Sequence, residues 1–361
     1  MSVKQSALVA AVALVPTHIA TTAHAQWTVT NLHHPVGTNG SGAQAASGGQ
    51  QVGNALVGGA SRASVWSGTA ASRVDLNPIG SALSYALSAS GGQQAGYARV
   101  GGVTRASLWS GTAASWVDLN PAGSTGSQAF ATSGGQQAGS ANVTGLNHAS
   151  LWSGSAASWV DLHPVGASQS EALAISGGQQ AGYARVGAAG GLERASLWSG
   201  TFASWIDLNP AGSTQSVAYA IEGGQQAGYA RLGAVSRASL WSGTAASWVE
   251  LNPLGATQSV VYAISGGQQV GNARVDGVTR ASLWSGTAAS WVDLSAFLPA
   301  GFTSSSAKGI STDGVNTYIA GVGFNSLTSR TEALLWTQPV PAPGAAVLLG
   351  LGGLLAARRR R

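Results

Sequence analysis

The sequence predicts an all-β fold, a seven-bladed β-propeller of four-stranded antiparallel blades, and three observations lead to it. A unit of about 43 residues recurs along the chain, and this is the length of a propeller blade. Each unit holds four short apolar or alternating runs separated by turn residues, which is the pattern of four strands. The last unit lacks its fourth run, and the start of the array can supply it by closing the ring.

The number of units follows from two recurring landmarks. Gly-Gly-Gln-Gln begins at Gly48, Gly91, Gly134, Gly177, Gly223 and Gly266. The Trp that ends the "ASLW" segment lies at Trp66, Trp109, Trp152, Trp198, Trp241, Trp284 and, in the weaker copy "EALLW", Trp336. The chain therefore has seven units, and the one three-residue excess, "GAAGGLE" at 187–193, indicates a loop insertion.

The second copy shows the expected strands in order: "SYALSAS", "QQAGYARV", "TRASLWS" and "SWVDLNP". Gly91 and Gly92 separate the first two runs, and adjacent glycines suit a tight type I′ hairpin turn. The third and fourth runs are expected to pair with Trp109 opposite Trp116. Pro121 ends the fourth run because proline cannot donate a hydrogen bond to the sheet.

The two ends of the array complement each other. The seventh copy stops at Trp336, and the segment "QWTVTNLHHP" that begins at Gln26 looks like the missing strand. Its Asn31-Leu32 matches the Asp-Leu of the other copies. We therefore expect the N-terminal strand to join the last blade.

The repeated Arg and Asp are predicted to pair within each blade, because the third and fourth strands bring them within diagonal reach. The expected pairs are Arg62 with Asp75, Arg105 with Asp118, His148 with Asp161, Arg194 with Asp207, Arg237 with Glu250, Arg280 with Asp293, and Glu332 with Asn31. If the pairs are buried, removing one partner costs roughly 3 to 5 kcal/mol. Six equivalent acids, each with a basic partner, indicate structure rather than catalysis.

The 13 Trp residues allow two interpretations. Exposed indoles could stack on sugar rings, whereas buried indoles would fill the gaps between strands rich in Ala and Gly. Each buried Trp removes roughly 200 Å² from water, so we expect about four in five of them to be inside.

The composition excludes a polyanion-binding surface on the body of the protein. The formal charge is +5, but Lys4 and the four arginines at 358–361 supply all of it, and the rest has 12 basic and 12 acidic residues. A neutral body has no positively charged surface that would attract the phosphates of a nucleic acid. The chain has no Cys, so the core alone must hold the fold.

Residues 1–25 are predicted to be a secretory signal peptide. Lys4 precedes an apolar run, and Ala23-His24-Ala25 precedes Gln26, which places the cleavage after Ala25. The predicted domain order is then signal peptide, propeller at 26–338, and a C-terminal segment at 339–361.

The C-terminal segment combines Val340, Pro341, Ala342 and Pro343 with a hydrophobic helix and a basic end, Arg358, Arg359, Arg360 and Arg361. It resembles the PEP-CTERM sorting signal, with Ala342 in place of the family's Glu. The resemblance implies transient anchoring in the inner membrane and an exosortase as partner, besides the export machinery. A plain tail anchor is the alternative, although the 13 apolar residues span roughly 20 Å, short of a bilayer core.

The repeat itself resembles the HAF repeat of secreted bacterial proteins. The likeness is carried by "VYAISGGQQVGNARVDGVTRASLWSGTAASWVDL", at Ala263-Ile264, Gln269-Val270-Gly271, the segment 280–284 and Asp293-Leu294, and it covers 27–336. Arg280 and Ser282 stand where the family has His and Phe. The resemblance implies an extracellular β-propeller and names no reaction.

The motifs of known enzymes are missing from the sequence. The mature region has four His residues without metal-site spacing, no Cys nucleophile and no Gly-x-Ser-x-Gly. We therefore predict no catalytic, cofactor-binding or metal-binding residues. Residues from different blades could still build an enzymatic site at the channel mouth, which remains the least favoured alternative.

The sequence thus predicts an exported, noncatalytic module of the cell surface or extracellular matrix, structural or binding in role. The main alternative is a lectin-like propeller that binds a glycan or exopolysaccharide at repeated pockets between blades. Its candidate contacts lie on the second strands: Tyr97, Arg99, Tyr183, Arg185, Tyr229, Arg231 and Arg274.

Overall fold

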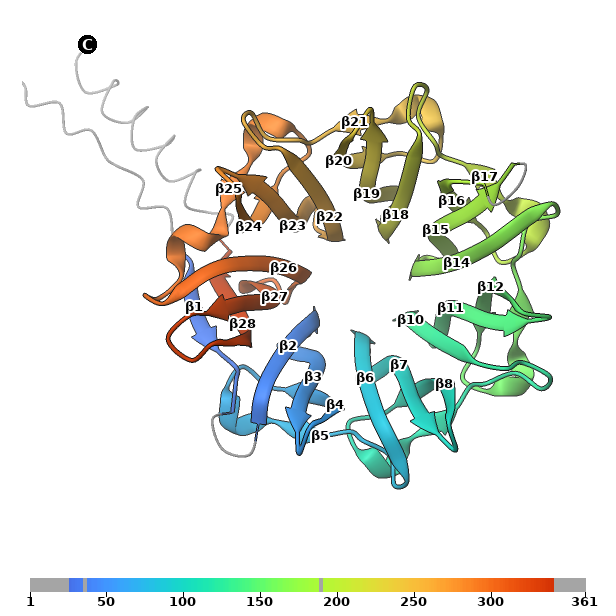
Figure 1. Ribbon diagram of the computed structural model, residues 1–361, viewed down its shortest axis with the longest axis horizontal. Coiled ribbons are helices and arrows are strands. Elements are labelled where there is room, and N and C mark those ends of the chain that lie inside the picture. Colours follow the sequence, from blue (N-terminus) through green and yellow to red (C-terminus); the bar gives the residue numbers. More distant parts are fainter. Residues whose placement is uncertain (1–25, 35–37, 188–190, 341–361) are drawn as a thin grey trace, which may run out of the picture.

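Seven four-stranded antiparallel sheets surround a central axis, which confirms the predicted all-β propeller (Figure 1). The computed structural model describes residues 26–34, 38–187 and 191–340. The predicted signal peptide lies outside the described residues, and so does the tail from Pro341 onward. Among the described residues, no helix is both long and apolar enough to cross a membrane.

The strands of each blade run outward from the centre in chain order, except that β1 is outermost in the seventh blade (Figure 1). The inner strands are β2 (Thr38–Ser47), β6 (Ser81–Ser90), β10 (Ser127–Ser133), β14 (Ala167–Ser176), β18 (Gln215–Glu222), β22 (Gln258–Ser265) and β26 (Phe302–Thr312). The second strands are β3 (Gln50–Val57), β7 (Gln93–Val100), β11 (Gln136–Val143), β15 (Gln179–Val186), β19 (Gln225–Leu232), β23 (Gln268–Val275) and β27 (Asn316–Asn325).

The third strands are β4 (Ala60–Trp66), β8 (Val103–Trp109), β12 (Leu146–Trp152), β16 (Glu193–Trp198), β20 (Val235–Trp241), β24 (Val278–Trp284) and β28 (Arg330–Pro339). The outer strands are β5 (Val74–Asp75), β9 (Val117–Asp118), β13 (Val160–Asp161), β17 (Ile206–Asp207), β21 (Val249–Glu250), β25 (Val292–Asp293) and β1 (Thr28–Asn31). The predicted insertion lies between β15 and β16, and its residues 188–190 are outside the described part.

The Gly-Gly-Gln-Gln segments form the predicted inner hairpin turns. Gly91 and Gly92 have φ values of 57° and 78°, a conformation that glycine adopts without steric cost. The buried Gln94 then locks the turn: its Nε2 donates to Gly92 O at 2.9 Å, and its Oε1 accepts from Gly111 N at 2.7 Å. The second Gln therefore ties the inner turn to the connection that follows the third strand.

The outer strands are shorter than the sequence suggested. In the second blade, Ser107 pairs with Asp118 and Leu108 with Val117, which is the predicted register. Trp116, however, caps a 3₁₀ turn and lies outside the two-residue strand. The equivalent turns are η1 (Ala70–Ser72), η2 (Ala113–Ser115), η3 (Ala156–Ser158), η4 (Phe202–Ser204), η5 (Ala245–Ser247) and η6 (Ala288–Ser290), and η7 (Leu294–Phe297) follows β25.

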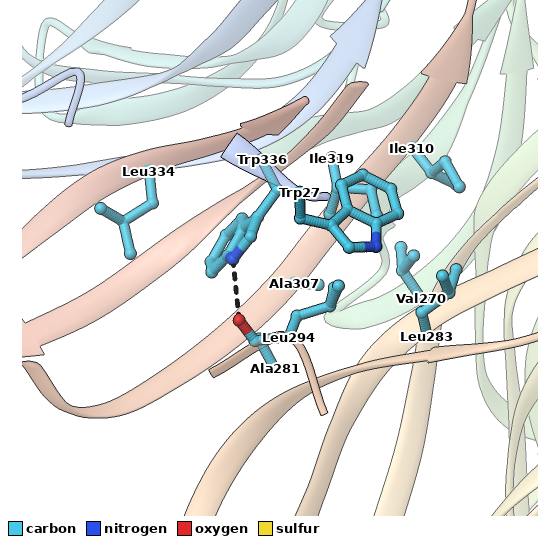
Figure 2. Close-up of a cluster of buried hydrophobic side chains, with 10 residues drawn as sticks. All are labelled: Trp27, Val270, Ala281, Leu283, Leu294, Ala307, Ile310, Ile319, Leu334 and Trp336. Atoms are coloured by element: carbon cyan, nitrogen blue, oxygen red, sulfur yellow. Dashed lines mark hydrogen bonds between the residues drawn. The ribbon is translucent and has the colours of Figure 1, made fainter. Parts of the chain in front are cut away.

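The N-terminal strand closes the ring as predicted. β1 pairs antiparallel with β28, with Thr28 opposite Thr337 and Asn31 opposite Leu334. Leu32 N donates to Ala333 O at 2.8 Å, as Leu119 N does to Ala106 O in the second blade. Figure 2 shows Trp27 beside the fully buried Trp336 in the core between the sixth and seventh blades.

One serine hydroxyl joins each pair of neighbouring blades. Ser127 Oγ on β10 accepts from Ala106 N on β8, at 2.9 Å. The same bond occurs at all seven interfaces, and the last one, from Ala333 N to Ser41 Oγ at 3.0 Å, crosses the point where the ring closes. Closure therefore uses the same contact as every other interface.

The Trp residues divide into two groups, and the prediction that four in five are inside was too high. Eight are buried: Trp27, Trp66, Trp109, Trp152, Trp198, Trp241, Trp284 and Trp336. The five that follow the 3₁₀ turns, Trp116, Trp159, Trp205, Trp248 and Trp291, are half-buried. They lie at the outer edge of their blades, where each donates its indole N–H to a buried serine such as Ser107, at 2.8 Å from Trp116. In the first blade, Arg73 Nε replaces the indole.

Candidate functional site in the central channel

The repeated Arg and acid side chains pair within their blades, as predicted. Arg105 Nη1 lies 2.6 Å from Asp118 Oδ2, and Asp118 Oδ1 accepts from Asn120 N. The other pairs are Arg62–Asp75 at 3.3 Å, His148–Asp161 at 2.8 Å, Arg194–Asp207 at 2.9 Å, Arg237–Glu250 at 2.8 Å, Arg280–Asp293 at 2.8 Å and, from Asn31 Nδ2 to Glu332 Oε2, 2.7 Å. Each acid thus has structural partners.

The pairs between the third and outer strands are more exposed than the sequence suggested, whereas Glu332 of the seventh blade is buried. The side chains of Arg105 and Asp118 are 32% and 31% exposed, because the outer strand of a blade is its solvent edge. The free energy expected for a buried pair therefore does not apply here. The smaller stabilisation typical of partly exposed ion pairs applies instead.

A double-mutant cycle on this pair tests the revised value. We expect Arg105→Gln and Asp118→Asn to show a coupling energy of about 0.5 to 1 kcal/mol in urea unfolding, since water screens the two charges. Asn at position 118 can still accept the hydrogen bond from Asn120 N. A coupling of about 3 kcal/mol or more would return the pair to the buried class.

The inner strands carry a second repeated feature that the sequence interpretation missed. Each has a β-bulge at its middle, for example between Ala218 and Ala220 on β18. Bulges re-aim one side chain away from the alternation of the strand. The seven bulge residues are Gln44, Leu87, Phe130, Leu173, Tyr219, Tyr262 and Lys308.

All seven bulge residues line one cavity on the axis of the ring. Its volume is about 310 Å³, within the range of small-molecule sites. The seven inner strands that surround it are visible in Figure 1. The lining is uneven, because Leu87, Phe130 and Leu173 make one side apolar, whereas Tyr219, Tyr262 and Lys308 make the other side aromatic and basic.

Lys308 is the single charged residue among those that line the cavity. Its Nζ lies 3.6 Å from the centre of the Tyr262 ring, and Tyr262 lies 5.6 Å from Tyr219 between ring centres. Burial lowers the pKa of Lys308 to about 8. A charged amine without a carboxylate partner in an apolar setting is costly, so this position is not explained by stability.

A polar network adjoins this side of the channel across the third, fourth and fifth blades. Asn147 Nδ2 donates to Glu171 Oε1 at 2.8 Å, and burial raises the pKa of the Glu171 carboxyl. Glu193 accepts from Arg185 at 2.9 Å and from Tyr229 at 3.5 Å. The two glutamates have no counterpart at the equivalent positions of other blades, which hold residues such as Tyr85 and Thr104.

The predicted ligand contacts do not gather in one place. Tyr183 and Arg185 belong with Tyr229 to the network around Glu171 and Glu193. Tyr97 stacks on Tyr85 in the second blade, with ring centres 5.0 Å apart, while Arg99, Arg231 and Arg274 are exposed on three different blades. None of the seven lines the central cavity. Of the predicted processing residues, Gln26 and Val340 are described and exposed, and the others lie outside the described part.

A glycine opposite each bulge makes the bend possible. A Cβ on Gly228 would lie 1.9 Å from Val217 O, the carbonyl two residues before Tyr219. We expect Gly228→Ala to lower the free energy of unfolding by about 2 kcal/mol, because a backbone must move to admit the methyl group.

Gly126→Ala provides the matched control for Gly228→Ala, since its Cβ would meet only one atom, Thr104 O at 3.4 Å. Thermal unfolding of both variants is the measurement. Equal stability of the two would contradict the close approach of the strands at the bulge.

A column-by-column comparison of the repeats carries the signal that could have found the channel residues. The bulge position holds Gln, Leu, Phe, Leu, Tyr, Tyr and Lys, whereas the residues on either side are small, for example Ala218 and Ala220 around Tyr219. A large side chain that varies between blades, flanked by small residues in every blade except at Val261, indicates a position that does not serve the common core.

Within the described ranges, no group of three His, Asp or Glu side chains could hold a metal ion. His148 and His163 do stack in the third blade, with ring centres 4.0 Å apart. Asp161 accepts from both residues, at His148 Nδ1 and at the backbone N of His163, each at 2.8 Å. His148 therefore takes the place of the Arg that bonds to the acid in other blades. His163 takes the place of the Asn whose backbone N–H donates to that acid, as Asn120 does in the second blade.

Comparisons with known proteins bear on the fold. No protein-family model and no curated sequence matches the chain. Among solved structures, it is similar to the Pyrococcus horikoshii acylaminoacyl peptidase, with a TM-score of 0.55 and 8% identity over 88% of this chain and 55% of that one. The chain thus spans about half the length of that peptidase.

A second similar structure is the β-propeller domain of the Trilobed protease from Pyrococcus furiosus, with a TM-score of 0.54 and 8% identity over 84% of this chain and 96% of that one. Its description gives it an open velcro topology, whereas β1 and β28 pair here. Identities this low establish the shared β-propeller architecture alone.

Proposed function

We propose that this protein is an exported, noncatalytic module of the cell surface or extracellular matrix that binds its ligand at the central channel. In this proposal the signal peptide delivers the chain to the export machinery. The tail then holds it in the inner membrane until an exosortase or a similar enzyme acts.

One observation supports the channel as the binding site. The repeated residues are already engaged in the fold: Arg105 with Asp118, Ser127 with Ala106 N, and Gln94 with the turns. The seven bulge side chains, which differ from blade to blade, meet instead in the cavity of about 310 Å³. Variation at one shared surface, on an otherwise uniform frame, is typical of a binding site carried by a rigid scaffold.

The lectin alternative is favoured in a modified form. Tyr219 and Tyr262 present two aromatic rings on adjacent blades of the channel, and aromatic faces suit the apolar C–H faces of sugar rings. The repeated pockets between blades receive less support, since Tyr97 stacks on Tyr85 and Tyr229 bonds to Glu193. The ligand class we propose is therefore a ring-bearing small molecule or a glycan unit.

Mass spectrometry of the protein recovered from the outside of the producing cell tests the export proposal. The expected N-terminal residue is Gln26, and the expected C-terminus lies at or near Val340. A protein that retains Met1 and is found only inside the cell contradicts the proposal.

A glycan array tests the binding proposal with two variants drawn from the repeats themselves. Tyr262→Gln installs the residue of the first blade, Gln44, and should abolish binding. Tyr97→Ser installs the residue of the third blade, Ser140, and should leave binding unchanged. The reverse result would place the ligand between the blades, and turnover of a bound glycan would overturn the noncatalytic assignment.

A further inference from the structure

The channel has one uncompensated charge. No Arg, Asp, Glu or His is among the cavity-lining residues, so the ammonium of Lys308 has no partner of opposite charge there. Among the described residues no ion pair to it is formed, and burial alone accounts for its altered pKa. The chain contains a single other lysine, Lys4, so this one is not part of a general basic surface.

Lys308, Tyr262 and Tyr219 lie next to one another on three consecutive blades. β26 supplies Lys308, β22 supplies Tyr262 under the ammonium at 3.6 Å, and β18 supplies Tyr219 at 5.6 Å from Tyr262. On the other side, β2 supplies the neutral Gln44. Tyr262 and Tyr219 are the titratable groups beside Lys308, and burial raises the pKa of both phenols, so they are neutral.

We propose that the channel binds a carboxylate carried on a six-membered ring, with the carboxylate on Lys308 Nζ and a face of the ring against Tyr262 and Tyr219. This inference rests on the proposed function and names the ligand class of that site. Two sources share the chemistry: a uronic acid unit of an acidic glycan, and an aromatic acid.

The physical reason is the balance of charge in the cavity. A cation–π contact attracts the ammonium but leaves its net charge in place. A carboxylate would neutralise that charge, and charge-assisted hydrogen bonds are among the strong ones in proteins. The apolar side formed by Leu87, Phe130 and Leu173 would exclude water from the ring.

Isothermal titration calorimetry of the purified full chain tests this proposal with four probes. Sodium D-glucuronate and sodium benzoate carry the carboxylate, and D-glucose and benzamide are their neutral counterparts. We expect one or both carboxylates to bind at least about tenfold more tightly than the matching neutral compound. Binding of glucuronate alone identifies a glycan source, and binding of benzoate alone identifies an aromatic acid.

The decisive variant is Lys308→Gln, which installs the residue that the first blade already has at this position. It should reduce the preference for the carboxylate at least about tenfold. Arg194→Gln removes the same charge from a position on β16 outside the cavity and should leave binding unchanged.

Proton uptake supplies an independent readout. Because the pKa of Lys308 is about 8, a bound carboxylate should raise it, and binding at pH 8 should take up about half a proton per site. Titrations in two buffers of different ionisation enthalpy measure this uptake, which Lys308→Gln should abolish.

Three outcomes would overturn the inference: no carboxylate binds, Lys308→Gln retains the carboxylate preference, or the neutral probes bind as well as the charged ones. If the neutral probes bind as well as the charged ones but Tyr262→Gln loses binding, the channel is still the binding site and only the preference for a carboxylate is wrong. The failure of this inference is therefore distinguishable from failure of the proposed function.

Discussion

Trp198→Ala is expected to lower the free energy of unfolding by about 3 to 5 kcal/mol. Trp198 on β16 is fully buried between the third and fourth blades. Its neighbours are mostly alanines with Leu151, Leu162 and Ile175. Small side chains on rigid strands cannot move in to fill the space, so the cost should lie at the upper end of the range. Urea unfolding followed by far-ultraviolet circular dichroism is the measurement.

Two further variants in the same blade separate volume from other effects. Trp198→Phe should cost about 1.5 kcal/mol, because the buried indole N–H has no hydrogen-bond partner in the described part of the protein. Phe202→Ala should change stability by no more than about 0.5 kcal/mol, since Phe202 is 52% exposed and the five equivalent turns of the other blades begin with Ala. A loss in Phe202→Ala equal to that of Trp198→Ala would contradict the assignment of the core.

The arrangement of strands and turns in each blade was predictable because it is repeated along the chain. Each local rule, such as the Gly91-Gly92 turn or the Arg105–Asp118 pair, was visible several times, so chance matches could be set aside. The closure was predictable for the same reason, since Asn31-Leu32 matched a known column of the repeat. The burial of the outer strand was not, because the sequence does not say that the strand has only two residues and a 3₁₀ turn before it.

The candidate site was harder to predict for a physical reason. A bulge shifts the alternation of a strand by one residue, so a side chain such as Tyr219 points to the channel where strict alternation places it between blades. Which residues of different blades approach one another, as Lys308 and Tyr262 do, depends on the ring and cannot be counted along one repeat.

Thr28→Cys combined with Thr337→Cys should stabilise the protein by up to about 5 kcal/mol when oxidised. The two residues are opposite each other in the β1 and β28 pair and 309 positions apart in the chain. A disulfide between them would close almost the whole propeller into one loop, which reduces the conformational freedom of the unfolded chain. The native chain has no cysteine that could compete. Thermal unfolding with and without reductant is the measurement.

The register of closure gives this experiment its control. In Thr28→Cys with Gln338→Cys, the second cysteine is displaced by one residue, and successive side chains of a strand point to opposite faces. This variant should remain reduced within the monomer and gain no stability. If both double variants form the intramolecular disulfide equally well, β1 does not hold a fixed register on β28. If neither forms it, the terminal strands do not meet, and the seven blades form an open ring.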